Sequence, residues 1–489
     1  MILNTYSGQS DDDLVDRLSK LTLLLAFACV AGVLMSIPFL QIFQKVPLNY
    51  NEGFNGYHVL ALLGGEPLYP PLDAFSTNNY PPLSFHVVAA LTPLFGDPII
   101  AGRFLAAASL LVSGLNIAIV VFVLTRYRFA ALLTPLVLLV YVGMWFNNYT
   151  AMNDPQWFGH ALQTSGLAVF VTGRRLVPET GRLVLAVALL FLGGLVKHNL
   201  LVLPLALLIW LAIHDRRAAL HFIAAGMVAV VVAAAVGWLL YGPSVFRSVF
   251  LHARVFDPQL MAHMMARHAS AFAPFAVAMV ALALLAWRDA GVQLVLLIYA
   301  VGLLVGVPAL GGEGVNFNAL FDVVLATCMG LMLFAALLAT RLEPAGLGFG
   351  TAFSLSAALM AAPLLGGLTE ANGAFKHWRW VGQREGEYLA LIESLATTEG
   401  PVACHMLSMC LWAGKAFEVE VYNYGQKLKT GRVPSELLLE RIRTGYYKRL
   451  QLQENFFEIG VVPENVEQAI RERYVVERSA PSLVLVPRP

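Results

Sequence analysis

Long apolar runs recur along the first three quarters of the sequence and constrain the fold more than any other feature. They fall at about 21–43, 99–125, 129–146, 158–173, 182–197, 199–213, 219–241, 271–287, 290–310, 318–340 and 347–367. A helix needs roughly 20 apolar residues to cross a bilayer, and several of these runs are shorter. The pattern predicts an α-helical polytopic membrane protein with about eleven transmembrane helices, give or take one or two.

Charged residues are unevenly distributed and mark a domain boundary. Only 13% of the chain is Asp, Glu, Lys or Arg and 58% is hydrophobic, whereas a water-soluble domain is about a quarter charged. Residues 1–367 hold 33 charged residues, and residues 368–489 hold the other 30 in a quarter of the length. We therefore predict a transmembrane domain over 1–367 and a small soluble domain over 368–489.

The soluble domain is predicted to be α/β and electrically neutral. Apolar strand-like stretches lie at 401–407, 417–422 and 474–486, and helical patterns lie near 384–397 and 435–450. Fifteen Lys and Arg balance fifteen Glu, which argues against nucleic-acid binding. Cys404 and Cys410 are either a disulfide or two free thiols, because spacing alone does not fix their geometry.

The positive charges of the short loops predict the orientation in the membrane. One side carries Arg17, Lys20, Arg126, Arg128, Arg174, Arg175, Arg182, Arg216, Arg217, Arg288 and Arg341. The opposite side carries Lys45, Arg103, Lys197, Arg247, Arg254 and Arg267. The first side has eleven against six, so we place it and the N-terminus in the cytoplasm and the C-terminal domain outside.

The longest loops then lie on the outer face. Loop 44–98 is rich in Pro, Gly, Asn and Tyr and is expected to carry short helices on the membrane surface. Its Tyr69 and Tyr80 flank proline pairs and are candidate substrate contacts, or parts of a structured loop without a chemical role. Long loops carry function more often than short ones, so we expect the site on this face.

Two acids of the outer loops are candidate catalytic residues. Glu52 lies close to the exit of the first helix, where a carboxylate serves as a general base or holds a divalent metal ion, or is a solvated loop acid. Asp154, in the loop 147–157, is either a second acid of the site or a cap of the next helix.

An excess of cations on the same face favours a phosphate-bearing substrate. Lys197 and His198 lie at the outer end of two short spans, Arg103 begins another, and Arg254 and His268 lie in the long loop 242–270. Such cations either extend to the lipid headgroups or pair with phosphate.

The loop 311–317 adds Glu313 and Asn316 to the candidate substrate contacts. It precedes Asp322, an acid one turn inside a span, where a charge is costly and is either functional or bonded to a neighbouring helix. The sequence has no Walker A, dinucleotide-binding, HExxH or CxxC motif, which disfavours nucleotide-driven and redox enzymes.

The order of motifs in the first outer loop resembles that of the GT-C glycosyltransferases. The run NEGFNGYHVLALLGGEPLYPP, followed by NNYPPLSFHVVAALTPLFGDPIIAGRF, is similar to the bacterial branch related to protein mannosyltransferases and lipid A aminoarabinose transferase. The later GGEGVNFNALFD and AGKAFEVEVYNYGQKLKTG also resemble segments of members. The resemblance covers nearly the whole chain in order, although each motif is loose.

This resemblance implies an enzyme of the bacterial inner membrane that moves a sugar from a polyprenyl-phosphate donor to an extracytoplasmic lipid, glycan or protein. It implies that Glu52 and Asp154 match the family's acidic positions, with a metal ion as an optional cofactor. Two departures are Asn51, where many members have Asp, and Tyr80, where aminoarabinose transferases have Lys. The phosphate-binding role is therefore assigned to Lys197 and Arg103.

Two other functions compete with glycosyl transfer. A transporter or lipid flippase predicts pseudo-symmetric halves and interrupted helices at mid-membrane, whereas the acids here cluster at one face. A non-catalytic scaffold would use the C-terminal domain to bind envelope partners and would have no turnover to lose.

Overall fold

The computed structural model describes residues 12–173, 179–342, 366–371 and 382–489, and most of them are helical. The helices of the first part are α1 (Asp12–Gln41), α2 (Tyr50–Leu63), α3 (Leu83–Phe95), α4 (Pro98–Thr125), α5 (Arg128–Trp145), α6 (Gln156–Val171), α7 (Thr180–Val196), α8 (Val202–His214), α9 (Arg216–Tyr241), α10 (Ser244–Phe250), α11 (Pro258–Arg267), α12 (Ala269–Ala286), α13 (Ala290–Ala309) and α14 (Phe321–Leu342). Each apolar run predicted between 21 and 340 coincides with one of them. The run at 347–367, and the loop residues Arg174 and Arg175, fall largely or wholly outside the described residues.

Seven of the described helices are long and apolar enough to cross a membrane, namely α1, α4, α5, α9, α12, α13 and α14. Helices α3, α7 and α8 are apolar but shorter. Helix α6 has 16 residues and carries the buried polar side chains of His160, Gln163 and Thr164. The structure therefore does not confirm the predicted number of about eleven spans.

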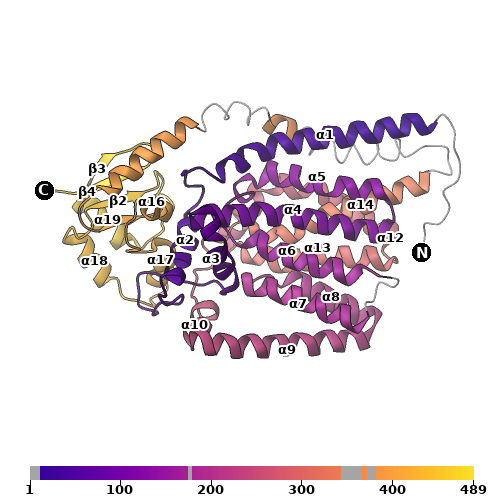
Figure 1. Cartoon of the computed structure of the whole chain (residues 1–489), viewed down its shortest axis with the longest axis horizontal. Helices are drawn as coiled ribbons and strands as arrows, with labels where there is room; N and C mark the ends of the chain where they lie inside the picture. Colours follow the sequence, from indigo (N-terminus) through magenta and orange to yellow (C-terminus); the bar gives the residue numbers. More distant parts are fainter. Residues whose placement is uncertain (1–11, 174–178, 343–365, 372–381) are drawn as a thin grey trace.

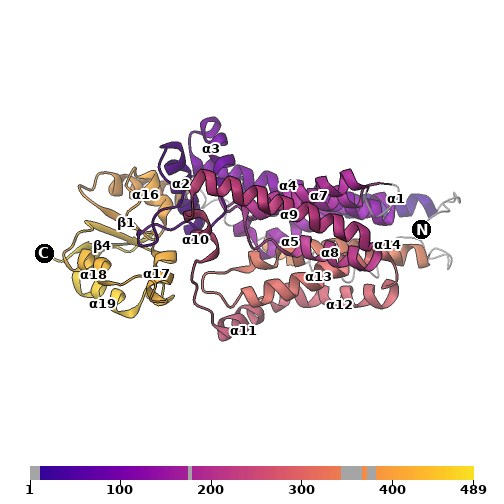
Figure 2. The same cartoon turned by 90° about the horizontal axis from the view of Figure 1, so that it is seen from below.

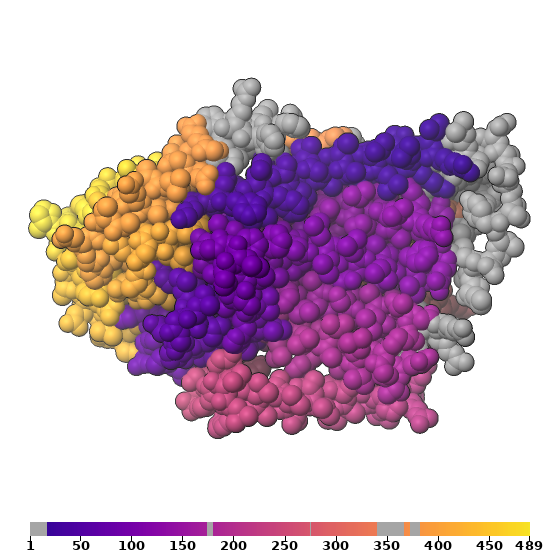
Figure 3. Space-filling view, in the orientation of Figure 1, coloured from indigo at the N-terminus to yellow at the C-terminus, as the bar shows by residue number. Residues whose placement is uncertain are grey.

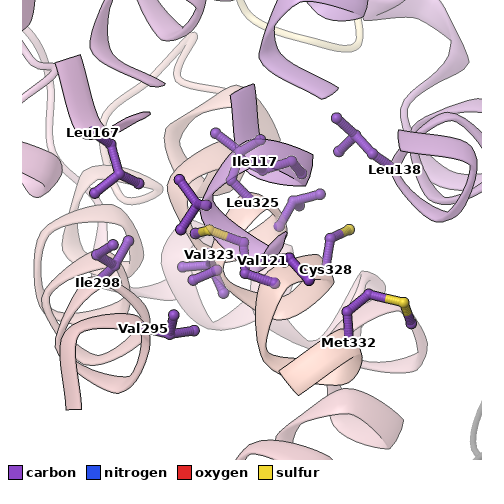
Figure 4. Packing of buried hydrophobic residues seen from close by; sticks show 14 of the residues in the cluster. Ile117, Val121, Leu138, Leu167, Val295, Ile298, Val323, Leu325, Cys328 and Met332 are labelled. Atoms are coloured by element: carbon purple, nitrogen blue, oxygen red, sulfur yellow. The ribbon is translucent and has the colours of Figure 1, made fainter. Parts of the chain in front are cut away.

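The bundle packs around α14, whose side chains are almost all buried. Figure 4 shows Ile117 and Val121 of α4 together with Val323, Leu325 and Cys328 of α14 in this core. Helices α4, α5, α12 and α13 all contact α14. Such a helix, apolar all round, is expected at the centre of a bundle.

The outer loop forms two short helices, of which α3 covers an apolar stretch predicted to be helical, and local signals fix where they begin and end. The Asn49 side chain accepts a hydrogen bond from the Asn51 amide and starts α2. Gly96 adopts the left-handed conformation that ends α3. Asp97 then caps α4 by accepting from the amides of Ile99 and Ile100.

The C-terminal domain is α/β, as predicted, with a four-stranded sheet in the order β1-β2-β4-β3. Its elements are β1 (Val402–Cys404), α16 (Leu407–Trp412), α17 (Val421–Lys429), α18 (Glu436–Arg443), β2 (Arg449–Leu452), α19 (Glu464–Arg473), β3 (Tyr474–Arg478) and β4 (Leu483–Pro487), and a further helix covers 382–396. Strand β1 runs parallel to β2, and β4 pairs antiparallel with both β2 and β3.

Two predictions for this domain are wrong. No strand covers 417–422; the Glu420 side chain instead caps α17 by accepting from the amides of Tyr422 and Asn423. The helical pattern predicted up to 450 ends at Arg443, and strand β2 begins at Arg449.

The C-terminal domain lies at one end of the bundle, and α2, α3 and α10 lie between the two parts (Figure 1). The described beginning of α1 lies at the opposite end of the bundle. Viewed from below, α11 projects from the bundle on the side that faces the domain (Figure 2). In the space-filling view the outer loop fills the junction between bundle and domain (Figure 3). This junction is where the predicted outer-face residues come together.

Candidate active site

Glu52 and Arg103 form a fully buried ion pair at the junction. Arg103 donates from Nε to Glu52 Oε1 at 2.6 Å and from Nη2 to Oε2 at 2.7 Å, and neither side chain is exposed. Glu52 lies in the first turn of α2, and Arg103 lies in the second turn of α4. Such a two-bond pair is strong and geometrically specific.

The same two side chains hold four segments of backbone together. Arg103 also donates to the carbonyls of Gln41, Gln44 and Val46, and Glu52 also accepts from the amides of Leu48 and Asn153. They therefore join the end of α1, the start of α2, helix α4 and the loop before α6. In this arrangement Arg103 binds protein groups, and we no longer assign it to a phosphate.

Glycines beside both members of the pair allow this close packing. A Cβ atom on Gly53 would overlap the backbone of Leu407 and Ser408, and one on Gly102 would overlap the Asn153 side chain. Gly53 thus lets α2 approach the C-terminal domain, and Gly102 lets α4 approach the loop that carries Asp154.

Asp154 is buried beside this pair and contacts Lys197. Its Oδ1 accepts from the Gln156 amide at 2.8 Å and lies 3.4 Å from Lys197 Nζ, and its Oδ2 accepts from Asn51 Nδ2 at 3.2 Å. The bond to Gln156 satisfies the first amide of α6, much as a helix cap does, whereas the role of Asp154 as an acid of the site stays a prediction. Asp154 also lines a cavity of about 10 Å³ with Asn55, the size that holds one water molecule.

Lys197 follows α7 and lies over the Tyr80 ring, 5.1 Å from its centroid. Burial alone would lower the pKa of Lys197, but Asp154 and Tyr80 outweigh that effect and raise it. The ammonium therefore stays protonated at neutral pH. A lysine and an acidic side chain therefore share one buried site beside the Tyr80 ring.

Further into the bundle, polar side chains continue from Asp154 to Asp322. Gln156 Nε2 lies 2.9 Å from His160 Nε2, Asn318 Nδ2 lies 3.5 Å from Gln156 Oε1, and His160 Nδ1 lies 3.7 Å from Asp322 Oδ1. At 3.7 Å these two atoms are too far apart for a hydrogen bond, and neither has another hydrogen-bond partner among the described residues. The structure therefore does not show the bond to a neighbouring helix considered for Asp322, and a functional role stays a prediction.

Arg254 and Glu313 form a second group, which holds the C-terminal domain. Arg254 donates to the Glu313 carbonyl at 2.6 Å, and the Glu313 carboxylate accepts from Gln426 Nε2 and Lys429 Nζ, both at 2.7 Å. Gln426 and Lys429 belong to α17. Glu313 is therefore paired across the junction in this structure.

The remaining predicted residues lie around these two groups. Tyr69 donates from its hydroxyl to the Tyr80 carbonyl at 3.0 Å. The Asn316 side chain accepts from the Phe317 amide at 2.8 Å, and the His268 ring packs on Phe317 with 3.3 Å between centroids.

His198 lies near both groups of cations. Burial lowers the pKa of His198 to about 4, and the charges of Lys197 and Arg254 add to this effect. The imidazole is therefore neutral at pH 7, and among the described residues its Nδ1 has no partner.

Comparison with known proteins rests on structure, because no protein-family model and no curated protein sequence matches the chain. The aminoarabinose transferase ArnT from Cupriavidus metallidurans, bound to undecaprenyl phosphate, aligns with 95% of this chain and 98% of its own, at a TM-score of 0.58 and 14% identity. The oligosaccharyltransferase AglB from Archaeoglobus fulgidus, with an inhibitory peptide and a dolichol-phosphate, aligns with 96% of this chain and 74% of its own, at a TM-score of 0.55 and 12% identity.

The chain has the GT-C fold. Within this GT-C fold, sequence reasoning missed the residues that the C-terminal domain brings to the junction. Tyr422 of α17 stacks on Tyr50 of α2 with 4.5 Å between centroids, and Lys427 donates to the carbonyls of Leu72 and Ala74. The signal was present in YNYGQKLK, whose aromatic and basic residues are unusual for a plain surface helix.

Proposed function

We propose that this protein transfers a sugar from a polyprenyl-phosphate-linked donor to an extracytoplasmic acceptor. The observation that carries the proposal is the buried Asp154–Lys197 pair, at 3.4 Å, at the junction of a GT-C fold. Solved proteins of similar fold were crystallised with undecaprenyl phosphate and with a dolichol-phosphate, which supports a donor of this class.

In the proposed reaction an acceptor oxygen attacks the anomeric carbon, and the bond from that carbon to the phosphate oxygen breaks. Asp154 takes the acceptor proton as general base, because it lines a cavity and lies beside Lys197. The electron pair of the broken bond leaves with the lipid phosphate, and Lys197 stabilises its added negative charge. The sugar ends on the acceptor, and polyprenyl phosphate is the other product.

Glu52, at the acidic position implied by the resemblance, is proposed to act through its neighbours. Its oxygens accept from Arg103 and from the Leu48 and Asn153 amides, and its own carbonyl accepts from Asn153 Nδ2. Because Asn153 precedes Asp154, this bonding fixes the position of the base. Glu52 is thus a positioning residue in this proposal.

A divalent metal ion is the cofactor that the sequence allowed, and an AglB structure was obtained with Zn and sulfate. Among the described residues no three His, Cys, Asp or Glu side chains lie close enough together to hold one ion. The oxygens of Glu52, the expected ligand, are taken by Arg103 and backbone amides. These residues do not fit a metal site in this arrangement, so no step is assigned to one.

The site is proposed to face the periplasm of a bacterial inner membrane, with the N-terminus in the cytoplasm. The Cys404–Cys410 disulfide supports this orientation, because such bonds persist mainly outside the cytosol. The acceptor is then an envelope lipid, glycan or protein, and the surrounding lipids are the other partners.

The roles of the two acids are separated by Asp154→Asn and Glu52→Gln in proteoliposomes with labelled polyprenyl-phosphate sugars. We expect Asp154→Asn to lower kcat of the folded protein by at least about 100-fold, the usual contribution of a general base, in addition to the loss of Tm that follows from leaving Lys197 unpaired. Glu52→Gln is expected to lower kcat and Tm together. Full turnover by correctly folded Asp154→Asn would remove Asp154 from the mechanism.

A further inference from the structure

A second and larger cavity lies at the junction, between the outer loop, α10 and the C-terminal domain. Its volume is about 290 Å³, and it is lined by three segments that are far apart in sequence. They are Pro70–Leu72 with Thr77 and Asn78, then Arg247, Ser248 and Leu251–Ala253, and finally Lys427 and Arg432. Among the described residues, the side-chain hydrogen bonds and ion pairs of Asp154 and Glu52 go to other residues than these.

The ionisable side chains that line this cavity are all basic: Arg247, His252, Lys427 and Arg432. Asp73 and Glu420 act on Lys427 electrostatically but do not line the cavity. The cavity therefore concentrates positive charge that its own walls do not neutralise.

Several donors around the cavity have no anionic partner within the described parts of the chain. Arg247 and Arg432 are exposed, and their guanidinium groups make no hydrogen bond to a described residue. Lys427 is 6% exposed and donates to two carbonyls, not to a carboxylate. The buried Thr77 hydroxyl and the Nε2 atom of His252 also lack a hydrogen-bond partner there.

We propose that this cavity is a binding site for an oxyanion group, a phosphate or a carboxylate. Guanidinium groups bind such groups with paired hydrogen bonds, and Thr77 adds a neutral donor from the opposite wall. The ligand is either the phosphate of a polyprenyl lipid or an anionic group on a soluble molecule, such as an acceptor. This proposal goes beyond the proposed transfer reaction, because the cavity binds an anion whether or not the protein transfers a sugar.

Two binding measurements on the full-length protein test the site and distinguish the two sources. Nanodiscs of phosphatidylcholine carry the wild type, Arg247→Gln, Arg432→Gln or the control Arg443→Gln, which changes an exposed arginine of α18 outside the cavity. Undecaprenyl phosphate is titrated into the discs and detected by native mass spectrometry. Inorganic pyrophosphate is titrated from solution and detected by calorimetry.

Each cavity variant is expected to weaken binding about tenfold relative to the control, the effect of one charge-assisted hydrogen bond. Weaker binding of undecaprenyl phosphate identifies a lipid phosphate as the ligand. Weaker binding of pyrophosphate alone identifies a soluble anion. If both cavity variants bind both probes as the control does, the site does not exist. Thr77→Val, which keeps every charge, is measured beside them and is expected to weaken binding as the arginine variants do.

Neither binding measurement requires the protein to be enzymatically active. If the wild type shows no transferase activity but Arg247→Gln still binds the anion more weakly than the control, the transferase proposal is contradicted and this site remains. If the wild type is active but both cavity variants bind the anions as the control does, the anion site is contradicted and the transferase proposal remains.

Discussion

At the residue scale the junction depends on charges that are buried in pairs. Glu52 and Arg103 are completely inaccessible to solvent, and Asp154 and Lys197 are nearly so. Removing one member of such a pair leaves the other charge buried and uncompensated, which costs more than the pair itself contributes. The stability of the junction is therefore sensitive to single substitutions.

Glu52→Gln is expected to lower the free energy of unfolding by about 3–5 kcal/mol, because Arg103 loses its counter-ion while remaining buried. Thermal unfolding in detergent, followed by tryptophan fluorescence, measures the change. The matched control is Glu436→Gln, an exposed acid in the first turn of α18, which should change the Tm little. An unchanged Tm in Glu52→Gln would show that the pair does not hold the junction.

Anion binding in the 290 Å³ cavity is expected to weaken as the pH rises through about 8. Burial is the main cause that lowers the pKa of Lys427 to about 8, so its ammonium is charged below that pH and neutral above it. The charged or titratable groups around Lys427 are Asp73 and Glu420, the Tyr424 ring, Arg247, His252 and Arg432. The arginines stay charged throughout, and His252, with a pKa lowered to about 4, stays neutral.

Lys427→Arg is the control for this pH dependence, since arginine keeps its charge to pH 12 and beyond. Glu420, whose pKa burial raises to about 7, and pyrophosphate itself also ionise in this range, but they do so with both proteins. Pyrophosphate affinity measured between pH 6.5 and 9.5 should therefore fall more steeply with pH in the wild type than in Lys427→Arg. Equal slopes in the two proteins would assign the titration to another group.

The sequence predicted most of the residues of the junction but not their partners. Tyr80, Asp154 and Lys197 were expected on one face, and the structure brings them together. Arg103 was assigned to phosphate, whereas it bonds Glu52. The Glu52–Arg103 contact depends on how α2 packs against α4. The sequence pattern of either helix alone does not predict that packing.

At the element scale, close contact between α2 and the C-terminal domain depends on Gly53. Gly53→Ala is expected to destabilise the junction because the new Cβ would meet the backbone of Leu407 and Ser408, which cannot move as a flexible side chain does. The overlap should cost about 1–3 kcal/mol. Gly194→Ala is the control, since its Cβ would meet no atom within 4 Å.

Limited proteolysis of the two glycine variants measures how tightly the domain is held. Cleavage between 382 and 489 should be faster in Gly53→Ala than in Gly194→Ala. Equal cleavage rates would show that the α2 contact does not anchor the domain.

The disulfide joins β1 to α16, the helix that packs on α2. The double variant Cys404→Ala, Cys410→Ala is expected to lower the free energy of unfolding of the domain by about 2 kcal/mol, from the lost constraint on the short loop. Urea unfolding of wild type and variant measures this difference. If reducing agent lowers the stability of the variant as much as that of the wild type, the effect does not come from this bond.

Among the elements, the apolar helices and the strands within 401–407 and 474–486 were predictable, whereas β2 was missed and the strand expected at 417–422 is absent from the described structure. A long apolar run avoids water and satisfies its own backbone hydrogen bonds as a helix. The runs between 21 and 340 therefore coincide with helices. Residues 417–422 have a strand-like pattern, but the Glu420 cap and the packing of Phe417 on Tyr57 fix a different backbone. Strand β2 has four residues and owes its conformation to β1 and β4 on either side.

At the scale of the whole molecule, the arrangement places the long loops and the C-terminal domain at one end. Helices α2, α3 and α10 lie between the bundle and the domain (Figure 1), and Asp154 is buried. Excluding water strengthens every charge interaction in such a site. The proposal of glycosyl transfer therefore depends on the complete chain and not on the bundle alone.

The most direct test of this proposal measures the lipid product, because that product does not depend on which acceptor is used. Proteoliposomes containing the wild type or Asp154→Asn receive a panel of undecaprenyl-phosphate sugars together with cell-envelope extract, and mass spectrometry follows the release of undecaprenyl phosphate. We predict release from at least one donor by the wild type, and a rate at least about 100-fold lower for folded Asp154→Asn. No release from any donor, or equal release by both proteins, would contradict the account.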